Sequence, residues 1–291
     1  MRSQRLSRHA LATVLPLLLA LLCTGCIGGT ANVQVVRAQE AVRAPADVDH
    51  SAFDRVLNPY VDAQGRVDYA RLQPDADSVL TPYLQQLAET DPSNLSRDEQ
   101  LAFWINAYNA YTIKLILDHY PVESINDIKP GAGPQIPKVN SPFKLDVGEV
   151  AGEVRTLDEI EHGIIREDFD EPRIHFALVC AAVSCPRLRR EAYEGTRLDA
   201  QLDAQARTFL HDDSKNVVPA GEGAIKLSRI FKWFDEDFGG SRASIQRFIA
   251  PYFEGPVRSR LESAAYDVDF RDYDWSLNDQ PRSTAARTGD E

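Results

Sequence analysis

The sequence predicts a helix-rich α+β domain built around a small mixed or antiparallel sheet, and three observations lead to this fold class. Helical patterns are long and frequent, and the clearest covers residues 97–120. The segments that favour strands are short, and they do not alternate with helices as a βαβ fold requires. Residues 51–278 contain no internal repeat and no long Pro/Gly/Ser-rich linker, so we expect one domain there.

The helix over residues 97–120 has a clear start, because Ser96 and Glu99 form a capping box. It is apolar on nearly all sides, which is typical of a buried helix. Asn106 and Asn109 lie on it three residues apart. We therefore expect both amides to be buried and hydrogen-bonded.

The remaining elements are shorter. We expect helices over residues 75–90, 157–168, 198–211, 229–234 and 242–250, and strands over residues 143–147, 153–156, 224–227 and 266–270. The first two strands form a hairpin through Ala151 and Gly152, and Thr156 with Glu159 caps the helix that follows. Residues 173–179 are apolar on both alternating faces, which predicts a buried strand.

Composition excludes two classes of protein. Of the 291 residues, 43% are hydrophobic and 26% are charged, which is too polar for a multi-span membrane protein. The formal net charge of −12 disfavours nucleic acid as a partner, because phosphate binding needs a surplus of Lys and Arg.

Residues 1–25 have the layout of a secretory signal, with three arginines before an apolar run over residues 10–22. That run is too short to span a bilayer, which takes about 20 apolar residues. The following Cys23-Thr24-Gly25-Cys26 resembles a bacterial lipoprotein signal, in which the second cysteine is lipidated. The alternative is cleavage after Ala31, which would release a soluble product.

The lipoprotein interpretation predicts a protein exported to the periplasm or beyond, whose partner is the lipid bilayer through acylated Cys26. Without residues 1–25, which contain three arginines and no acid, the net charge falls from −12 to −15. Residues 26–50 then read as a flexible tether, and residues 279–291 as a disordered tail.

Cys185 follows the predicted strand and precedes Pro186, a residue favoured at the first position of a helix. A short helix over residues 186–193 would place the Cys185 thiol at its N-terminus, where the backbone dipole stabilises a thiolate. Three arginines in its first turn would oppose that dipole. They are either solvated surface residues or groups that hold a thiolate or an anionic ligand.

Two histidines lie upstream of Cys185 and close to it in sequence. His175 interrupts the predicted buried strand and is more typical of a hydrogen-bonded core histidine. His162 lies on the polar side of a short helix, flanked by carboxylates. We therefore prefer His162 as a partner for the thiol.

Three kinds of site remain open. In the first, Cys185 is the nucleophile of an acyl-transfer enzyme, and His162 or His175 is its base. In the second, both histidines and both mature cysteines bind a soft metal, although their spacing matches no common zinc site. In the third, Cys180 and Cys185 form a disulfide, as an oxidising compartment favours.

Several linked segments make the chain similar to a known family. They are Phe103–Ala110, Leu157–Gly163, Arg173–Leu178, Ser184–Pro186, Lys232–Phe234 with Asp237–Phe238, and Tyr273–Asn278. Together they resemble domain-of-unknown-function family 547 (DUF547) over most of residues 51–278. The family implies no settled activity. The combination of thiol and imidazole is similar to papain-like or transglutaminase-like thiol enzymes.

We therefore expect a thiol-dependent hydrolase or acyltransferase that acts on an envelope peptide or protein, without a cofactor or metal. The alternative is a non-catalytic binding or scaffold module with a Cys180–Cys185 disulfide. The sequence makes no prediction of oligomeric state. The candidate catalytic residues are Cys185, His162, His175, Glu161 and Asn106, and the candidate ligand-binding residues are Arg166, Arg173, Arg187 and Asn109.

Overall fold

The computed structural model describes residues 48–129 and 141–281. The predicted signal, Cys26 and most of the predicted tether lie outside the described residues, as do residues 282–291 of the predicted tail. Within the two described ranges, no helix is both long enough and apolar enough to cross a membrane.

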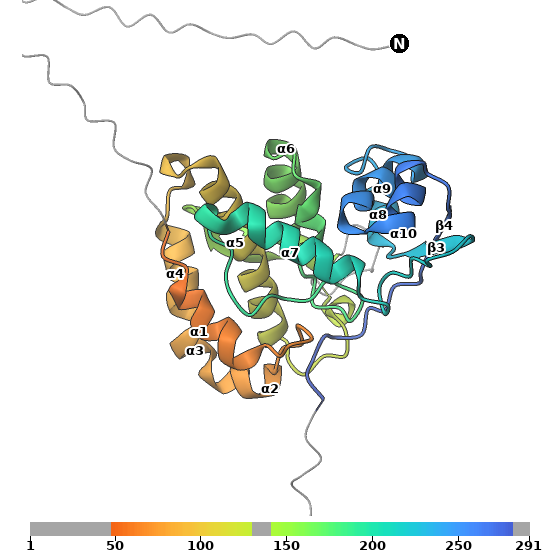
Figure 1. Cartoon of the computed structure of the whole chain (residues 1–291). Coiled ribbons are helices and arrows are strands. Elements are labelled where there is room, and N and C mark those ends of the chain that lie inside the picture. Colours follow the sequence, from red (N-terminus) through yellow and green to blue (C-terminus); the bar gives the residue numbers. More distant parts are fainter. Residues whose placement is uncertain (1–47, 130–140, 282–291) are drawn as a thin grey trace, which may run out of the picture. The chain divides into compact units, whose positions relative to one another are not determined.

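The described chain begins with a group of helices, over residues 51–117 (Figure 1). They are α1 (Ser51–Tyr60), α2 (Tyr69–Leu72), α3 (Ala76–Val79), α4 (Thr81–Glu89) and α5 (Arg97–Leu117). The helix predicted over residues 75–90 is therefore two helices. Pro82 explains the break, because it cannot donate the backbone hydrogen bond that would join α4 to α3. Helix α1 was not predicted.

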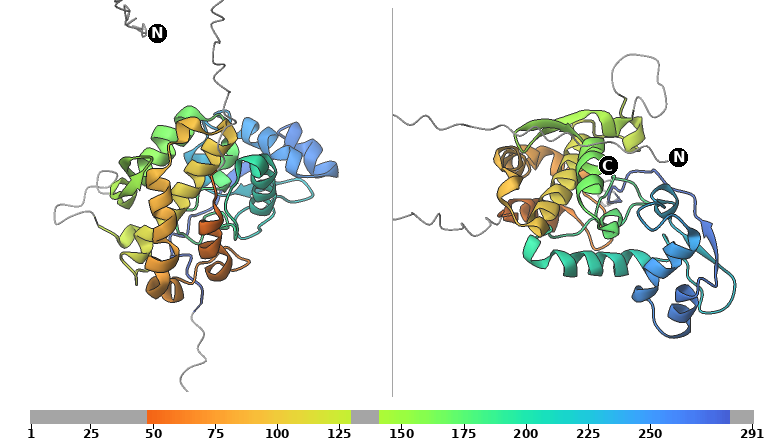
Figure 2. Two further views of the ribbon diagram at one scale, coloured as in Figure 1. Left: turned by 90° about the vertical axis from the view of Figure 1, so that its left-hand side faces the viewer. Right: turned by 90° about the horizontal axis from the view of Figure 1, so that it is seen from above.

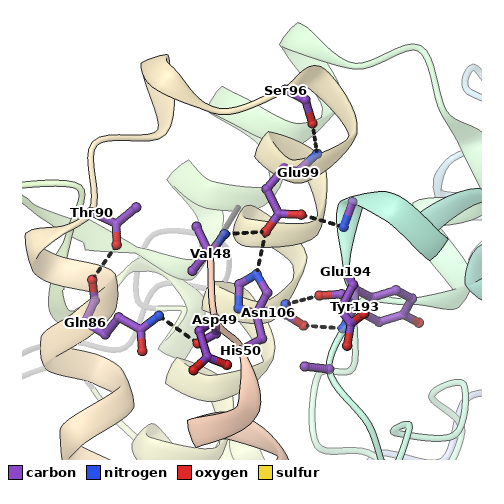
Figure 3. A network of polar contacts seen from close by, with 12 residues as sticks. Val48, Asp49, His50, Gln86, Thr90, Ser96, Glu99, Asn106, Tyr193 and Glu194 are labelled. Carbon is purple, nitrogen blue, oxygen red and sulfur yellow. Dashed lines mark hydrogen bonds and ion pairs between the residues drawn. The ribbon is translucent and has the colours of Figure 1, made fainter. Parts of the chain in front are cut away.

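Helix α5 is buried over most of its length, as its apolar pattern predicted. Ser96 Oγ accepts a hydrogen bond from the backbone N–H of Glu99 at 3.2 Å, which is half of the predicted capping box. The Glu99 carboxylate instead accepts hydrogen bonds from the backbone of Val48 at 3.2 Å and of Gly195 at 2.6 Å, and it pairs with His50 Nε2 at 3.2 Å (Figure 3). Glu99 thus joins three distant segments.

His50, which we assigned to the tether, is only 3% exposed. Its Nδ1 lies 2.7 Å from the Tyr83 hydroxyl, and its Nε2 faces Glu99. The packed part of the chain therefore begins before residue 51.

Strands β1 (Asp146–Val150) and β2 (Glu153–Thr156) form the predicted antiparallel hairpin. Ala151 and Gly152 both have positive φ, as a tight two-residue turn requires. The capping box then forms in full, because Thr156 N donates to Glu159 at 2.9 Å and Glu159 N donates to Thr156 at 3.1 Å. The helix that follows is a π-helix over Glu159–Ile165, which continues into α6 (Arg166–Asp168).

The strand predicted over residues 173–179 is wrong. Pro172–Phe176 is a 3₁₀ helix, followed by a turn. The segment is apolar on both faces because it is wholly buried, and such a run does not distinguish a strand from a short buried helix. The side chain of Asn109, instead of a neighbouring strand, takes the backbone hydrogen bonds of Ala177 and Val179.

The helix predicted over residues 186–193 is also wrong, because these residues form an irregular segment. The three arginines that would have opposed a helix dipole form ion pairs or hydrogen bonds with other groups. Arg187 pairs with Asp212, Arg189 with Glu191, and Arg190 with the backbone of Asn58. Cys185 therefore does not lie at a helix N-terminus.

Helix α7 (Leu198–Leu210), which was predicted, follows this irregular segment. It runs from the side of the first helices towards the C-terminal group of helices (Figures 1 and 2). Its contacts include α5 and the 3₁₀ helix Pro172–Phe176.

The C-terminal group has its own hydrophobic cluster. It consists of β3 (Ala224–Leu227), α8 (Ile230–Trp233), α9 (Arg242–Ile249), α10 (Gly255–Glu262) and β4 (Asp267–Phe270). Strands β3 and β4 are parallel. The described fold is therefore α+β, as predicted, although its strands form two separate pairs. Helix α10 was not predicted.

After the C-terminal group, residues 276–280 run back to the earlier part of the fold. Val183 N donates to Ser276 O at 2.8 Å, Asn278 N to Ala181 O at 3.0 Å, and Gln280 N to Val67 O at 2.9 Å. Residues 279–280, which we assigned to the tail, are thus hydrogen-bonded to the domain. This return places residues 273–275 against the loop that carries both cysteines.

Candidate active site

One cavity, of about 190 Å³, brings together four of the residues selected from the sequence, namely Glu161, His162, His175 and Cys185. Its ionisable lining also includes Asp158 and Cys180. The rest of the lining is mainly aromatic, with Tyr108, Phe143, Trp233, Phe234, Tyr273 and Trp275. Pockets that bind small ligands have this composition, with an apolar wall and a few convergent polar groups.

The loop from Cys180 to Cys185 turns its backbone N–H groups towards one sulfur atom. Cys180 N donates to Cys185 Sγ at 3.1 Å, and the backbone of Ala182 also hydrogen-bonds to this sulfur. Between them, Ala181 has a φ of 58°, in the left-handed region that alanine rarely adopts. Successive N–H groups in such a turn form a concave site for an anion.

The two cysteines are free thiols and direct neighbours. Their Sγ atoms lie 2.6 Å apart. The Tyr273 hydroxyl lies 3.2 Å from Cys185 Sγ and 3.3 Å from Cys180 Sγ. Each sulfur atom is thus within hydrogen-bonding distance of the other sulfur atom and of the Tyr273 hydroxyl.

These contacts shift the pKa values of the two thiols in opposite directions. Burial alone opposes ionisation of Cys185. Hydrogen bonds from Cys180, Tyr273 and the two backbone groups outweigh burial and lower the pKa of Cys185 to about 7. The hydrogen bond to Cys185, together with burial, raises the pKa of Cys180 well above its usual value. At neutral pH Cys185 is therefore partly ionised, and Cys180 is the thiol that donates to it.

A second polar group in the cavity is His175, which lies on the 3₁₀ helix and is 3% exposed. Its Nε2 lies 2.6 Å from Asp237 Oδ2. Its ring stacks on Phe234, with the ring centroids 4.0 Å apart. These contacts fix the plane of the imidazole and leave Nδ1 as the nitrogen that does not face Asp237.

Asp237 also binds Arg166, whose Nε and Nη2 donate to the two carboxylate oxygens at 2.6 and 2.8 Å. Burial opposes ionisation of Asp237, but the hydrogen bonds from His175 and Arg166 hold the pKa of this carboxyl well below its usual value. Burial lowers the pKa of His175, although Asp237 partly opposes this effect. His175 is therefore a neutral base near pH 7, oriented by a charged carboxylate.

His162 has a different environment. Its Nδ1 lies 2.9 Å from Arg166 Nη1, and it must accept this hydrogen bond because a guanidinium only donates. Burial, followed by the charge of Arg166, lowers the pKa of His162. His162 is thus joined through Arg166 to the Asp237–His175 pair.

Glu161 contributes a carboxyl group to the same cavity. The Tyr108 hydroxyl donates a hydrogen bond to it. Burial raises the pKa of Glu161 to about 7, although Tyr108 and Arg166 oppose the shift. A carboxyl group that is half protonated at neutral pH can donate or accept a proton there.

The two asparagines do not line the cavity. Asn106 donates to Tyr193 O at 2.8 Å and accepts from Tyr193 N at 2.9 Å (Figure 3). Asn109 donates to Ala177 O at 3.0 Å and accepts from Val179 N at 2.9 Å. Each side-chain amide thus donates to one backbone carbonyl and accepts from one backbone N–H, as a neighbouring β-strand would. Together they tie both ends of the segment that carries the cysteines to α5.

The predicted anion-binding arginines are also separate from this cavity. Arg166 is held by Asp237, and Arg173 pairs with Glu171 at 2.6 Å and with Asp199 at 2.8 Å. Arg187 pairs with Asp212 at 3.1 Å. Arg187 lines a second cavity next to Cys185.

The metal-binding alternative requires several ligands to converge on one point. Among the residues that the structure describes, no three His, Cys, Asp or Glu side chains are grouped so that they could hold a metal ion.

Sequence reasoning missed two residues of this site, Asp237 and Tyr273. Neither is distinctive on its own, because this chain has 44 acidic residues and 10 tyrosines. Both lie in segments that carry the family resemblance, and this was the signal that could have identified them.

The fold and the cavity define an α+β protein that has a pair of thiols, one of them with a lowered pKa, and an imidazole–carboxylate pair at one pocket. Residues 92–210 match the family model described as "Protein of unknown function, DUF547". This match confirms the resemblance over that range, which includes Glu161, His175 and Cys185. Asp237 and Tyr273 lie beyond it. No curated protein and no solved structure matches the chain.

Proposed function

We propose that this protein is an exported, lipid-anchored thiol hydrolase or acyltransferase with Cys185 as its nucleophile. One observation carries the proposal. A thiol with a pKa lowered to about 7 lines the same cavity as a neutral imidazole that a carboxylate orients. Nucleophilic catalysis by cysteine needs these three groups. Export and the lipid anchor rest on residues 1–26 of the sequence alone.

In this mechanism, the Cys185 thiolate attacks the carbonyl carbon of an amide or ester and forms a carbon–sulfur bond. The nearest hydroxyl donor for the developing oxyanion is Tyr273, 3.2 Å from Cys185 Sγ. Burial raises the pKa of Tyr273 well above its usual value, so the hydroxyl keeps its proton. The leaving group departs with a proton from an acid in the cavity, and the acyl group stays on Cys185.

His175 is the base that fits the second step. Its Nδ1 takes a proton from the attacking water or amine, the thioester bond breaks, and the Cys185 thiolate is restored. We prefer His175 to His162, which was our first choice, because His162 Nδ1 already accepts a hydrogen bond from Arg166. Cys185 and His175 line the same cavity, but no hydrogen bond joins them in the part of the chain that the structure describes. A bound substrate would therefore lie between the two groups.

The test is to trap the acyl-enzyme. The full chain is incubated with a panel of activated esters and amides, and the modified residue is located by mass spectrometry. The proposal predicts an acyl group on Cys185 in the wild type and in Cys180→Ser. His175→Ala should accumulate the adduct, because its breakdown lacks a base. Acylation that is absent, or that persists in Cys185→Ala at another residue, would contradict the proposal.

A second candidate is a non-catalytic binding module in which Cys180 and Cys185 are joined. The distance of 2.6 Å between the sulfur atoms favours it, because a disulfide could form without movement of the backbone. The mass of the intact chain, purified without reductant, tests it. A mass lower by two hydrogens, with no thiol reactive in the native protein, would support this candidate and contradict the enzyme.

A further inference from the structure

A second cavity, of about 220 Å³, shares Cys185 and Pro186 with the candidate active site. Three cationic side chains line it, Arg66, Arg187 and Lys215, against the Asp212 carboxylate and the partly ionised Cys185 thiol. This local excess of positive charge contrasts with the net charge of −12 of the whole chain.

The hydrogen-bonding capacity of the only carboxylate among the described lining residues, Asp212, is already taken up. Asp212 Oδ2 accepts hydrogen bonds from Arg187 at 3.1 and 3.2 Å, and Oδ1 accepts from the backbone and hydroxyl of Ser214 at 3.0 and 2.6 Å. Within the described ranges, neither Arg66 nor Lys215 forms an ion pair with a carboxylate. Two cations of this cavity therefore have no carboxylate in direct contact among the described residues.

Lys215 is a largely buried cation of this cavity. Burial lowers the pKa of this ammonium; the charges of Asp212 and Cys185 oppose the shift, and the smaller effects of Arg187 and Arg66 add to it. A bound anion would offset the cost of burying this ammonium, because it interacts favourably with all three cations. Lys215 also donates a hydrogen bond to Val183 O, inside the loop from Cys180 to Cys185.

The wall of the cavity depends on a close backbone contact. Gly65, with a φ of 75°, approaches the next segment so closely that a Cβ atom there would lie 2.5 Å from Leu188 N. Only glycine permits this approach. It brings the backbone of Arg66 beside that of Arg187, so the cations are held by packing from opposite segments.

We propose that this second cavity binds a small oxyanion, a carboxylate or phosphate group, that the substrate carries close to its scissile acyl group. The oxyanion site itself follows from the unpaired cations. Its role as part of the substrate site rests on the proposed function, because it depends on Cys185 being the nucleophile.

The first experiment tests the oxyanion site without any catalysis. Thermal unfolding of the full chain is followed with increasing inorganic phosphate, at an ionic strength kept constant with chloride. Phosphate should raise the Tm of the wild type and of the control Lys226→Gln, whose side chain is exposed on β3. The rise should be smaller in Arg66→Gln, whose side chain makes no hydrogen bond in the described residues. An equal rise in Arg66→Gln and wild type, or none in either, would overturn the site.

The second experiment tests the link to Cys185. Alkylation by anionic iodoacetate is compared with alkylation by neutral iodoacetamide at about pH 9, where a thiol with a pKa of about 7 is ionised. In Arg66→Gln and Lys215→Gln the ratio of the two rates should fall about threefold, because only iodoacetate is attracted by the lost charge. An unchanged ratio would overturn the role in the substrate site. If neither reagent reacts with Cys185, the proposed function fails, and the phosphate experiment still decides the oxyanion site.

Discussion

His175 Nε2 lies 2.6 Å from Asp237 Oδ2, although the two residues are 62 positions apart in the chain. The same carboxylate receives two hydrogen bonds from Arg166. Helix α6, the 3₁₀ helix and the segment after α8 therefore meet at one carboxylate. Since His175 lines the cavity beside Cys185, this contact is what would orient a base towards the thiol.

Asp237→Asn should remove the charge that orients His175 and leave Arg166 without an ionic partner. We expect a loss of about 1–3 kcal/mol in the free energy of unfolding, measured with urea. Breakdown of an acyl adduct on Cys185 should slow, while its formation stays closer to the wild-type rate. The matched control is Asp203→Asn, which removes the exposed partner of Arg207 and should change stability by less than about 0.5 kcal/mol. Equal effects of both variants would contradict the role given to Asp237.

Glu161 should make the protein less stable as pH rises towards neutrality. Burial raises its folded-state pKa to about 7, whereas an unfolded glutamate titrates at about 4.3. Between these values the unfolded chain releases a proton that the folded protein retains, so the free energy of unfolding falls with rising pH. Relative to Glu161→Gln, the wild type should lose up to about 3 kcal/mol across this range.

Urea unfolding at several pH values measures this difference. The control is Glu167→Gln, an exposed carboxyl on α6, which should keep the wild-type profile. Parallel profiles of wild type and Glu161→Gln would show that Glu161 is not buried as described.

The thiol pair should respond to a disulfide oxidant such as oxidised glutathione. The Cys185 thiolate attacks the reagent and releases one glutathione thiolate. The Cys180 sulfur then displaces the second, which takes up the Cys180 proton, and a Cys180–Cys185 disulfide remains. We expect loss of alkylation at Cys185 and its recovery with dithiothreitol. Cys180→Ser should stop at the mixed disulfide, detected by mass. A stable mixed disulfide in the wild type would contradict the observed proximity of the two sulfur atoms.

The sequence was enough to select Cys185, His162 and His175 as candidates, because thiol and imidazole groups are rare in this chain. It could not locate Asp237, because one carboxylate among many becomes special only through a contact made across the fold. We predicted a catalytic role for Asn106 and a ligand-binding role for Asn109. Both side chains instead form hydrogen bonds to backbone groups. The long helix α5 was predictable from local periodicity. The conformation of residues 173–193 was not, because side chains of α5, which is distant in sequence, form hydrogen bonds with the backbone of this segment.

Tyr273→Phe should raise the pKa of Cys185, because it removes one of the hydrogen bonds that stabilise the thiolate. A shift of about one unit is expected in the pH profile of alkylation. Tyr266→Phe is the control, since its hydroxyl donates to Pro219 O at 2.9 Å, away from the cavity. If both variants shift the profile equally, the effect is not specific to the contact between Tyr273 and Cys185.

The most direct test of the account is the rate of iodoacetamide alkylation of Cys185 in the reduced, native full chain as a function of pH, with each cysteine assigned by mass spectrometry. The account predicts a single titration with a midpoint at about pH 7 at Cys185, and little reaction at Cys180 below pH 9. Cys180→Ser should retain a reactive Cys185. A midpoint near the ordinary thiol value of about 8.5, or preferential alkylation of Cys180, would contradict the assignment of Cys185 as the activated nucleophile.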